Sequence, residues 1–597
     1  MTTAEEDAIL ARATGSYKPR PLEVPQATGR AVPEMPAPLH EDKEDSLEGA
    51  LSGLEPGTPL FVTFANEGYL DFLVNWVRFG VAAGLDPMVV GAMDAKVLHT
   101  ARAMGVRAFS MEHTIHSFGW GAQIGIIEEV LGLGFHVLMS DVDVVWLRDP
   151  LPYFEGTEPR RKADLLVSSD CASSLKDEAE GKCILAPFNI GIMYWRSTAL
   201  SKALAKEWGD GVRKAGGMTY MGEQGLLNEI VRGKDGKRAF PTKAVPGSDK
   251  DGRGAVLWSR MPEGELAFGM LPVGLFTHGH NYFVSGVPQS LGLHPYCVHA
   301  TYQFGSGKGG QQAGKRQRFR EAGLWMGDPD EYYTGGSSYI TWAVGSRLDD
   351  WIGAHTGHGA ELVDKHMAAV QFHLLCLRNA LALGKLLKRA VVLPRMQCYC
   401  DRHWTPILPA CKMANSDLEP PFWCPLDHIV EVKVLLNNMG GVEVKEQGFL
   451  QHARVPGEVK SSVAFASVGP LGNSTAPPAA DDGRVHVAWP AHASDAEAKS
   501  ALEAAGAASA RVLEFDGMEH AFCGWAKKED NDKFNKLLYG PHYGRHGAGA
   551  LNSNNWCCEN TQKGGYRPSP RPFHMPPPLE CPRGEGSRRR ARRARKL

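Results

Sequence analysis

The first 150 residues alternate between short apolar runs and longer stretches with helical spacing. The run Leu60–Phe64 (LFVTF) is short, apolar and rich in β-prone residues, which is typical of a buried strand. The same pattern returns in PMVVGAM, VRAFSM and FHVLM, and helical patterns separate these runs, among them Ala95–Met104 and Gly121–Gly132. Strands that alternate with helices predict a doubly wound, mostly parallel α/β sheet. Ligands of such sheets bind outside the carboxyl ends of the strands.

The alternation becomes less regular in the middle of the chain and then resumes. Strand-like runs occur in ADLLVSSD and FNIGIMYWR, followed by helical patterns at Ala199–Lys214 and Glu223–Val231. A loose, glycine-rich stretch at residues 305–314 indicates a domain boundary around residue 330. Beyond it, a long helical pattern at Val363–Leu387 and the strand pattern AVVLP predict a second, Rossmann-like α/β domain. We therefore predict a flexible arm at 1–57, a first α/β domain at 58–330, a second α/β domain at 331–570 and a disordered Pro/Arg-rich tail at 571–597.

Composition and charge narrow the class of protein. Of the 597 residues, 43% are hydrophobic and 22% are charged, which excludes fibrous or wholly disordered architecture. The stretch Arg583–Leu597 holds eight Lys/Arg and one Glu, whereas the whole chain has a net charge of −2, so the remainder is near −9. A body of that sign does not fit duplex nucleic acid, and we predict no nucleic-acid partner.

The sequence shows neither a signal peptide nor a membrane-spanning segment. No uninterrupted run reaches the ~18–20 apolar residues that such a helix needs. Acidic residues near the N-terminus stand where a signal peptide would have its positive start. We therefore expect contact with a membrane only through an anchor that this chain does not contain.

Two acids follow directly after the apolar run Phe135–Met139, in the sequence SDVDVVWLRDP. Alternate residues of an extended chain point the same way, so Asp141 and Asp143 share one side at the end of the strand. Two neighbouring carboxylates repel each other and lose hydration, and a bound cation removes that cost. Oxygen ligands suit Mg²⁺ or Mn²⁺, which keep open positions for the oxygens of a diphosphate. The alternative is a strand-end turn with two solvated aspartates.

The motif LMSDVDVVWLRDP, together with FNIGIMYWRST, resembles the nucleotide-diphospho-sugar transferase domain of plant and algal glycosyltransferase family 77, and most of all the extensin arabinosyltransferases. The resemblance continues through VGAMD, GLLNEIV, GLFTHGHNYFV, YCVHATYQF and GKRQRFREA, and then through FWCPLDHIVEV and NWCCEN, so that it covers about residues 58–570. It implies a GT-A fold, a divalent metal (Mn²⁺ or Mg²⁺), a UDP-sugar donor and retention of the anomeric configuration.

The resemblance further implies transfer of L-arabinofuranose to hydroxyproline-linked glycans of cell-wall glycoproteins in the Golgi lumen. Two alternatives remain open at this point. One is transfer of another sugar, xylose or galactose, to a wall polysaccharide. The other is a glycan-binding protein with weak catalysis or none.

The resemblance also assigns residues to the site. Asp141 and Asp143 become the nucleotide and metal carboxylates, and His299 in CVHATYQ is the expected third metal ligand, with His278 and His280 as competitors. Residues after the first two strands are expected at the nucleotide: Thr63, Ala65, Asn66 and Asp94. Basic side chains of GKRQRFREA are expected in a loop that neutralises the departing diphosphate, the alternative being a solvated charged helix: Lys315, Arg316, Arg318 and Arg320.

Asn189, Glu223 and Gln224 are expected to act on the transferred sugar. A retaining transferase either forms a glycosyl-enzyme on a carboxylate or admits the acceptor on the face that the diphosphate leaves. In the second route a phosphate oxygen takes the acceptor's proton. The family pattern has Asp-Gln before the following helix, whereas this sequence has Glu223-Gln224. The extra methylene displaces the carboxylate by about an ångström, so we expect Glu223 to position the sugar rather than to attack it. A glutamate that stabilises a helix N-terminus is the alternative.

The second domain resembles, more faintly, the nucleotide-sugar-binding domains of O-fucosyltransferases, through LRNALALGKLLKRAVVLP. Arg378 and Asn379 in this phrase are expected to serve structure or acceptor positioning, with independent catalysis as the alternative. The spacing of a cysteine group favours disulfides over zinc, because it contains no paired CxxC; its members are Cys398, Cys400, Cys411 and Cys424. The adjacent Cys557 and Cys558 could bond to distant partners, and Asn473-Ser474-Thr475 is a glycosylation acceptor on a predicted loop.

Overall fold

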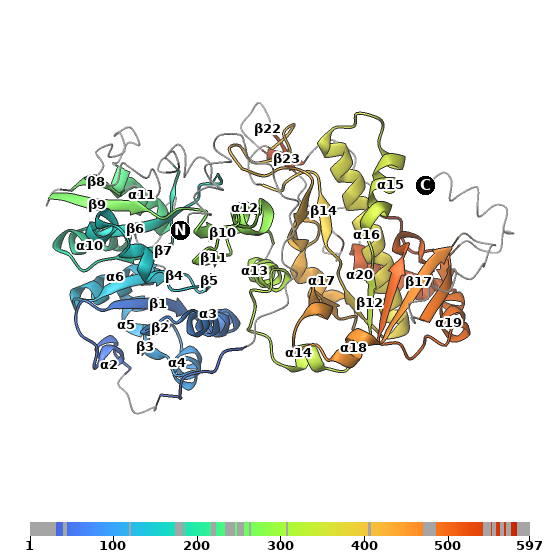
Figure 1. Cartoon of the computed structure of the whole chain (residues 1–597), viewed down its shortest axis with the longest axis horizontal. Helices are drawn as coiled ribbons and strands as arrows, with labels where there is room; N and C mark the ends of the chain where they lie inside the picture. The colour runs from blue at the N-terminus through green and yellow to red at the C-terminus, as the bar shows by residue number, and fades with distance from the viewer. Residues whose placement is uncertain are drawn as a thin grey trace. The chain divides into compact units, whose positions relative to one another are not determined.

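The computed structural model describes residues 32–39, 45–118, 121–173, 183, 186–215, 222–232, 245–246, 256–261, 264–305, 309–403, 407–469, 485–540, 551, 557–560, 566–568 and 575–581. The chain divides into two compact units (Figure 1). The first unit holds most of the chain up to Tyr302 together with Asn415–Asp417, and the second holds Gln303–Ala414 and the chain from Leu418 onward. This division falls earlier than the boundary near residue 330 that the sequence indicates.

The first unit is built on an eight-stranded sheet with the order β3-β2-β1-β4-β7-β6-β9-β8. Four strands pair in parallel as predicted: β1 (Pro59–Ala65), β2 (Met88–Ala92), β3 (Arg107–Ser110) and β4 (His136–Ser140). The remaining strands mix parallel and antiparallel pairing: β6 (Leu165–Ser169), β7 (Phe188–Trp195), β8 (Val256–Met261) and β9 (Gly264–Met270). Strand order reverses between β1 and β4, so the carboxyl ends of these two strands form the edge at which open α/β sheets bind ligands.

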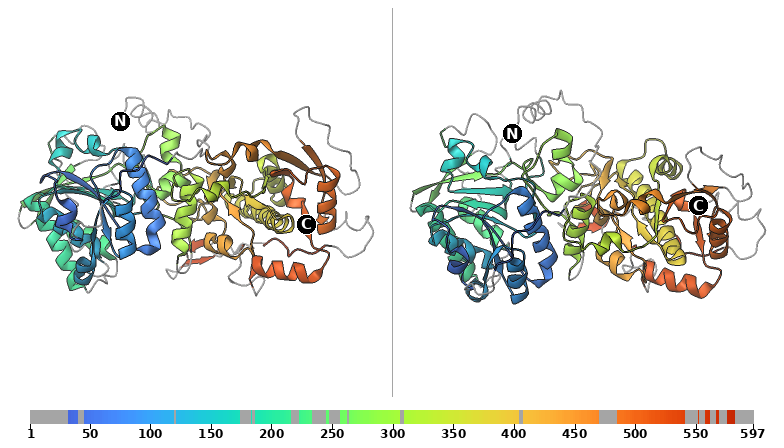
Figure 2. Two further views of the ribbon diagram at one scale, coloured as in Figure 1. Left: turned by 90° about the horizontal axis from the view of Figure 1, so that it is seen from below. Right: turned by 60° about the horizontal axis from the view of Figure 1, so that its bottom comes forward.

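Helices cover both faces of this sheet, because its strands are apolar on both sides (Figures 1 and 2). On one face, α6 (Ala122–Gly132) and α10 (Ala199–Lys214) pack through side chains such as Ile126 and Trp208. On the other face, α3 (Leu70–Ala83) and α4 (Ala95–Ala103) pack through Trp76 and Val97. The helix α10 has the bounds that the hydrophobic spacing predicts.

A small three-stranded sheet, β10-β11-β5, completes the first unit. Its strands are β5 (Val144–Trp146), β10 (Phe276–His278) and β11 (Cys297–His299). Strand β11 pairs antiparallel with β5, which directly follows Asp143. This pairing brings a late segment of the chain beside the carboxyl end of β4.

Part of the segment expected to be a flexible arm is folded. The short helix α2 (Leu47–Leu51) is capped by Ser46, whose hydroxyl accepts from the backbone N–H of Gly49 at 3.0 Å. Leu47 and Leu51 are buried in the core that packs on β1. The apolar pattern predicts that the folded part of the chain begins at Pro59. In the structure it begins earlier and includes α2.

The second unit has a six-stranded sheet in which every pair is parallel, with the order β16-β13-β12-β20-β17-β18. Its strands are β12 (Tyr339–Trp342), β13 (Ala390–Val392), β16 (Val444–Lys445), β17 (Val463–Gly469), β18 (Val485–Pro490) and β20 (Val512–Asp516). Strand order reverses between β12 and β20, as in Rossmann-like sheets. The prediction of a second Rossmann-like domain is confirmed.

The helix α16 (Leu362–Leu387) is the long helix that the sequence predicts. Among the described residues it is the one helix that is long and apolar enough to cross a membrane, although we expected no such segment. However, 89% of its apolar window is buried inside the second unit. This burial is typical of a core helix.

The clustered cysteines form disulfides, as expected. Cys398 pairs with Cys424 across the hairpin of β14 (Met396–Cys398) and β15 (Phe422–Cys424), and Cys400 pairs with Cys411. Two further disulfides are Cys171–Cys183 and Cys523–Cys581. The glycosylation acceptor and the side chains of Cys557 and Cys558 lie outside the described part of the chain.

A fully buried ion pair joins two distant segments of the second unit. Arg318 lies in α13 (Gly310–Glu321), and its Nε donates to both carboxylate oxygens of Asp427 at 3.0 Å. Both side chains have 0% exposure. Although burial by itself would raise the pKa of Asp427, Arg318 and His428 outweigh it and lower that pKa to about 2. Arg318 is therefore neither in a loop nor solvated, contrary to the expectation.

We expect Asp427→Ala to destabilise the second unit by about 3–5 kcal/mol, because the substitution leaves the Arg318 guanidinium buried without its carboxylate. Urea denaturation followed by fluorescence measures this loss. The control is Asp532→Ala, which breaks an exposed ion pair with Lys528 in the same unit and should change stability by no more than about 0.5 kcal/mol. Equal effects of the two substitutions would contradict a structural role for the buried pair.

Candidate metal and nucleotide-sugar site

Asp141 and Asp143 lie in a tight turn between β4 and β5. The backbone N–H of Asp141 donates to the carbonyl of Gly191 on β7 at 2.9 Å. The N–H of Val144 donates to the carbonyl of Asp141 at 3.1 Å and closes the turn. The two acids are thus fixed at the carboxyl end of β4, where the sequence predicts them.

Ser140 holds the strand end in front of this turn. Its hydroxyl oxygen accepts from the indole N–H groups of Trp76 and Trp146, at 3.0 and 3.3 Å. Both tryptophans are buried in the core on the α3 side of the sheet. The serine and the tryptophan of the motif SDVDVVW therefore serve to anchor the turn that carries the acids.

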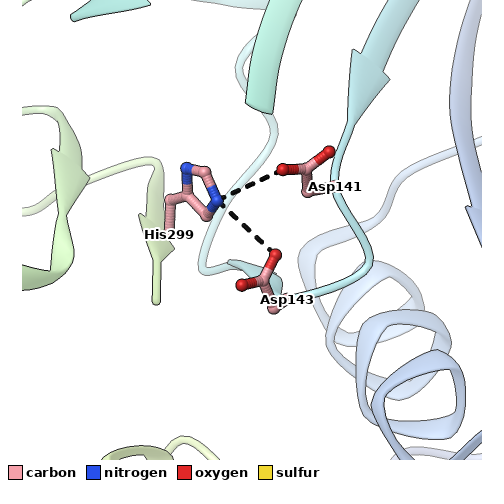
Figure 3. Close-up of side chains that lie close together, drawn as sticks. All are labelled: Asp141, Asp143 and His299. Atoms are coloured by element: carbon pink, nitrogen blue, oxygen red, sulfur yellow. Dashed lines mark ion pairs between the residues drawn. The ribbon is translucent and has the colours of Figure 1, made fainter. Parts of the chain in front are cut away.

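His299 on β11 reaches the two acids through the pairing of β11 with β5. His299 lies opposite Val144 in that pair, and the N–H of Ala300 donates to the carbonyl of Asp143 at 3.1 Å. The imidazole Nε2 lies 3.4 Å from Asp141 Oδ2 and 3.5 Å from Asp143 Oδ1, between the two carboxylates (Figure 3). Among the described residues this is the group whose donor atoms, all within 4.8 Å of one another, could hold a metal ion.

The donor set and its surroundings fit a small divalent cation. Two carboxylates and one imidazole supply hard and borderline ligands, as Mn²⁺ and Mg²⁺ sites with open positions require. Gly191 leaves the space beside them, because a Cβ there would lie 2.2 Å from His299 Cε1 and 2.9 Å from Asp141 Oδ2. Asp143 and His299 are buried, whereas 35% of the Asp141 side chain is exposed, so the cluster is open on the side of Asp141.

The electrostatics of the cluster favour a cation. Burial by itself would lower the pKa of His299, but the carboxylates of Asp143 and Asp141 outweigh it and raise that pKa to about 9. In the metal-free protein the imidazole is therefore protonated near neutral pH. A metal ion would take the place of this proton between the two acids.

A hydrogen-bonded group of amides and one carboxylate lies next to the cluster. Asp170, at the carboxyl end of β6, accepts from Asn189 Nδ2 at 2.8 Å and from Gln224 Nε2 at 3.1 Å. Asn189 Oδ1 in turn accepts from the N–H of Gly191 at 2.9 Å. Burial raises the pKa of the Asp170 carboxyl, and the two amide donors oppose this shift. The network orients the carboxyl group of Asp170 beside the cluster of Asp141, Asp143 and His299.

Glu223 lies in the first turn of α11 (Gly222–Arg232), one residue before Gln224. Burial and then the charge of Asp141 raise its pKa to about 7. The carboxyl group of Glu223 is therefore close enough to Asp141 for the two charges to repel each other. It is largely neutral below pH 7. A neutral carboxyl group can donate a hydrogen bond but is a poor nucleophile.

Known proteins are similar to this chain, one of them over most of its length. The family model for nucleotide-diphospho-sugar transferases matches residues 83–319. The arabinosyltransferase XEG113 of Arabidopsis thaliana is 31% identical over 537 residues, which cover 85% of this chain and 75% of that protein. The chain belongs to this family of glycosyltransferases. The resemblance to glycosyltransferase family 77 is thereby confirmed, and the first unit is the GT-A domain.

Two further similarities are weaker. A UDP-D-xylose:L-fucose alpha-1,3-D-xylosyltransferase of Arabidopsis thaliana is 24% identical over 250 residues, covering 40% of this chain and 55% of that protein. The crystal structure of the galactosyltransferase LgtC in complex with donor and acceptor sugar analogs covers 46% of this chain and 98% of its own, with 14% identity and a TM-score of 0.28. We draw no conclusion from a structural match at that level.

The residues expected at the nucleotide are spread over the ends of β1 and β2 of the glycosyltransferase domain. Thr63 is fully buried within β1, and its contact with a nucleotide stays a prediction. Asn66 caps the 3₁₀ helix η1 (Glu67–Tyr69), and Asp94 caps α4 while also accepting from the N–H of Glu67 at 2.6 Å. Contact of Ala65, Asn66 or Asp94 with a nucleotide stays a prediction.

The competing histidines of the FTHGHNYF motif do not join the metal cluster. His278 is fully buried, its Nε2 lies 2.7 Å from the carbonyl of Cys171, and burial lowers its pKa to about 3. His280 Nδ1 lies 3.1 Å from the hydroxyl of Ser285. Among the described residues, neither histidine belongs to the group that could hold a metal ion.

The four basic residues expected at the diphosphate all lie in α13 of the second unit. Arg318 is bound to Asp427, Arg320 forms an ion pair with Asp328, and the Arg316 guanidinium lies 5.7 Å from the ring centroid of Trp325. A role of Lys315 and Arg316 toward the diphosphate stays a prediction.

Three residues around the cluster were not expected from the sequence: Asp170, Gly191 and Tyr302. Asp170 directly follows the buried strand of ADLLVSSD, which is the same strand-end signal that identified Asp141. Gly191 lies inside the quoted motif FNIGI, but only the three-dimensional approach of His299 explains it. Tyr302 donates its hydroxyl to the backbone carbonyl of Asp170 at 2.9 Å, a contact between segments far apart in the sequence.

We expect Gly191→Ala to weaken Mn²⁺ binding by about 10- to 100-fold, because the new methyl group displaces the His299 imidazole. Isothermal titration calorimetry on the metal-free transferase measures the affinity. Gly132→Ala is the control, since a Cβ there has no atom within 4 Å. Wild-type affinity in Gly191→Ala would contradict the assignment of His299 as a ligand.

The affinity for the metal ion should also depend on pH. It should rise with pH, because the metal displaces the proton of His299. Its pKa of about 9 means that a proton occupies the imidazole at neutral pH, and the metal must displace it. Affinity for Mn²⁺ should therefore rise about tenfold per pH unit between about pH 7 and 8.5, with release of about one proton.

Titration calorimetry in buffers of different ionisation enthalpy measures that proton release. The variant Glu223→Gln removes a neighbouring group whose pKa is about 7 and should keep most of the pH dependence, whereas His299→Gln should lose it. An affinity independent of pH in the wild-type protein would contradict the protonated state of His299.

Proposed function

We propose that this glycosyltransferase transfers L-arabinofuranose from a UDP-sugar to a hydroxyproline-linked glycan of cell-wall glycoproteins, with retention of configuration and with Mn²⁺ or Mg²⁺ bound. The observation that carries the proposal is the cluster of Asp141, Asp143 and His299 at the carboxyl edge of a GT-A sheet. The arabinosyltransferase from Arabidopsis thaliana, similar over most of both chains, supports arabinose as the sugar.

Asp141, Asp143 and His299 would hold the metal ion. When bound, that ion neutralises the donor diphosphate and stabilises it as a leaving group. Asp143 and His299 are buried, so their positions are fixed by packing, while Asp141 faces the open side of the cluster. Asp141 would therefore be the acid that faces the donor.

The neighbouring network is suited to hold the sugar. A carboxylate with two fixed amide donors accepts hydrogen bonds from sugar hydroxyls in one orientation, and Asp170 has such donors in Asn189 and Gln224. Glu223, in the first turn of α11, would position the sugar by hydrogen bonding. This favours the route in which the acceptor enters on the face that the diphosphate leaves and a phosphate oxygen takes its proton.

An oxidising compartment fits the cysteines. Among the described residues, eight cysteines form four disulfides, which persist in the secretory pathway but rarely in cytosol. Together with the similarity to an arabinosyltransferase, this supports the Golgi lumen as the site of action.

Transfer of xylose is the second candidate. Two Arabidopsis thaliana proteins named UDP-D-xylose:L-fucose alpha-1,3-D-xylosyltransferases are each 24% identical to this chain, over 250 and 310 residues. Arabinose and xylose are both pentoses, so the same metal cluster would serve either donor. A glycan-binding protein without catalysis is the outcome if no donor is consumed.

A donor screen tests the proposed function. We expect purified protein to turn over UDP-L-arabinofuranose faster than UDP-xylose or UDP-galactose, and only with Mn²⁺ or Mg²⁺ present. Asp143→Asn should lower turnover at least about 100-fold, because it removes a ligand charge without changing side-chain shape.

Asp149→Asn is the matched control, since Asp149 belongs to the same motif but accepts from the N–H of Leu151, the first residue of the helix α7 (Leu151–Phe154), at 2.9 Å. It should retain turnover. Preference for UDP-xylose would replace the proposed sugar, and metal-independent turnover would overturn the role of the cluster.

A further inference from the structure

The second unit contains a proline-rich segment that the sugar-transfer site does not use. Residues Met575–Cys581, here called the strap, include three consecutive prolines, Pro576–Pro578. The strap ends at Cys581, which forms a disulfide with Cys523 in β21 (Phe522–Gly524). The sequence places this segment in a disordered tail, whereas the structure holds it against α20 (Lys528–Tyr539).

Two donors meet the carbonyl groups of the prolines. The hydroxyl of Tyr539 lies 3.0 Å from the carbonyl oxygen of Pro576 and 3.2 Å from that of Pro577, and is placed to donate to either. Arg378 Nη1 donates to the carbonyl of Pro577. Prolines have no backbone N–H, so consecutive prolyl carbonyls met by an aromatic hydroxyl and a cation are typical of polyproline recognition.

Asn535 fixes the register of the strap. Its Nδ2 donates to the carbonyl of Leu579 at 3.1 Å, and its Oδ1 accepts from the N–H of Leu579 at 2.9 Å. The side chain of Leu579 is 2% exposed and Pro576 is buried, whereas Pro577 and Pro578 are exposed. These contacts therefore bind the backbone and two anchors, and leave the rings of Pro577 and Pro578 open to substituents.

The guanidinium group of Arg378 is also fixed by hydrogen bonds that do not involve the strap. Its Nε and Nη2 donate to Asn379 Oδ1 at 3.0 and 2.8 Å. Asn379 Nδ2 donates to the carbonyls of Met518 and Glu519, in the turn directly after β20. Arg378 is thus fixed beside the carboxyl end of β20, next to the reversal of strand order, where open α/β sheets bind their ligands.

We propose that Arg378, Asn535 and Tyr539 form a docking surface for a proline-rich polypeptide, and that the strap is an internal occupant of this surface. The Cys523–Cys581 disulfide keeps the strap at an effective concentration on the order of millimolar, so a partner must displace it. That the partner is the glycosylation acceptor rests on the proposed function, whereas the docking itself does not.

The test uses the full chain and a fluorescent peptide with the sequence of residues 575–580, followed by fluorescence anisotropy. Replacing Pro576, Pro577 and Pro578 by glycine in the protein weakens the strap, because glycine loses more conformational entropy on ordering. The disulfide and the docking surface stay unchanged. We expect this strap-weakened chain to bind the peptide at least about tenfold more tightly than the wild-type chain.

Tyr539→Phe in the strap-weakened chain keeps the ring and removes the hydroxyl donor, so peptide affinity should fall about fivefold. Tyr399→Phe is the matched control, because its hydroxyl is bonded to Asp349 elsewhere in the unit; it should leave the affinity unchanged. A peptide with glycine in place of the three prolines should bind at least about tenfold more weakly. Thermal melting of each variant checks that the unit is folded.

Two results would overturn the proposal: no binding of the peptide to the folded strap-weakened chain, or equal binding whether or not Tyr539 and the peptide prolines are present. The strap would then be a structural element alone. If the triple glycine variant does not fold, Cys581→Ser takes its place, since it releases the tether and leaves the surface intact, with the same expected gain in peptide affinity.

Sugar transfer and docking are measured separately. If the docked polypeptide is the acceptor, the strap-weakened chain should show a lower KM for a proline-rich acceptor with an unchanged kcat. Peptide binding without any sugar transfer would leave the docking surface standing and overturn the acceptor assignment. Sugar transfer without peptide binding would do the reverse.

Discussion

The glycosyltransferase site depends on the repulsion between two carboxylates held together at the end of one strand. Asp141 and Asp143 cannot separate, because the turn that carries them is bonded to β7 at one end and to β11 at the other. Without a positive partner this arrangement would be costly in a buried setting. The protonated imidazole of His299 supplies that partner, and the same position suits a metal ion. The fold thus maintains a place that attracts positive charge.

The neighbouring acids extend this electrostatic field. Glu223 and Asp170 both have raised pKa values because of burial, and the charge of Asp141 adds to the shift of Glu223. Each of them is easier to ionise once a cation occupies the cluster, since Coulombic attraction then opposes the cost of burial. Metal binding at this cluster would therefore be coupled to the ionisation of Glu223 and Asp170.

The hydrophobic spacing and short motifs of the sequence correctly predicted several helices and strands and the place of the two aspartates. The helix α10 and the strands around β1 follow from hydrophobic spacing, and Asp141 and Asp143 follow from a strand-end motif. His299 was expected from family resemblance alone, because its position depends on the pairing of β11 with β5, which no local pattern encodes. Gly191 was missed for the same reason, because only the approach of His299 explains it. Asp170, in contrast, directly follows a buried strand and carries the same local signal as Asp141.

The basic residues of α13 show what charge patterning in the sequence cannot predict. Charge patterning cannot distinguish a solvated arginine from one that is buried with a carboxylate, and Arg318 is buried with Asp427, more than one hundred residues away in sequence. Disorder inferred from composition fails in a similar way. Met575–Cys581 is rich in proline, yet a disulfide and side chains of α20 order it.

Both units use the same architectural position for different chemistry. In each sheet the first three strands run outward to one edge and the later strands lie on the other side, and backbone ends gather at the carboxyl edge where these two halves meet. In the first unit the side chains at this edge are carboxylates and an imidazole, which select a cation. In the second unit the edge presents Arg378 and Arg347, and Arg347 is already paired with Asp516 and Glu519. Arg378 instead donates to a backbone carbonyl of the strap, so this edge is suited to a neutral polypeptide rather than to a second nucleotide diphosphate.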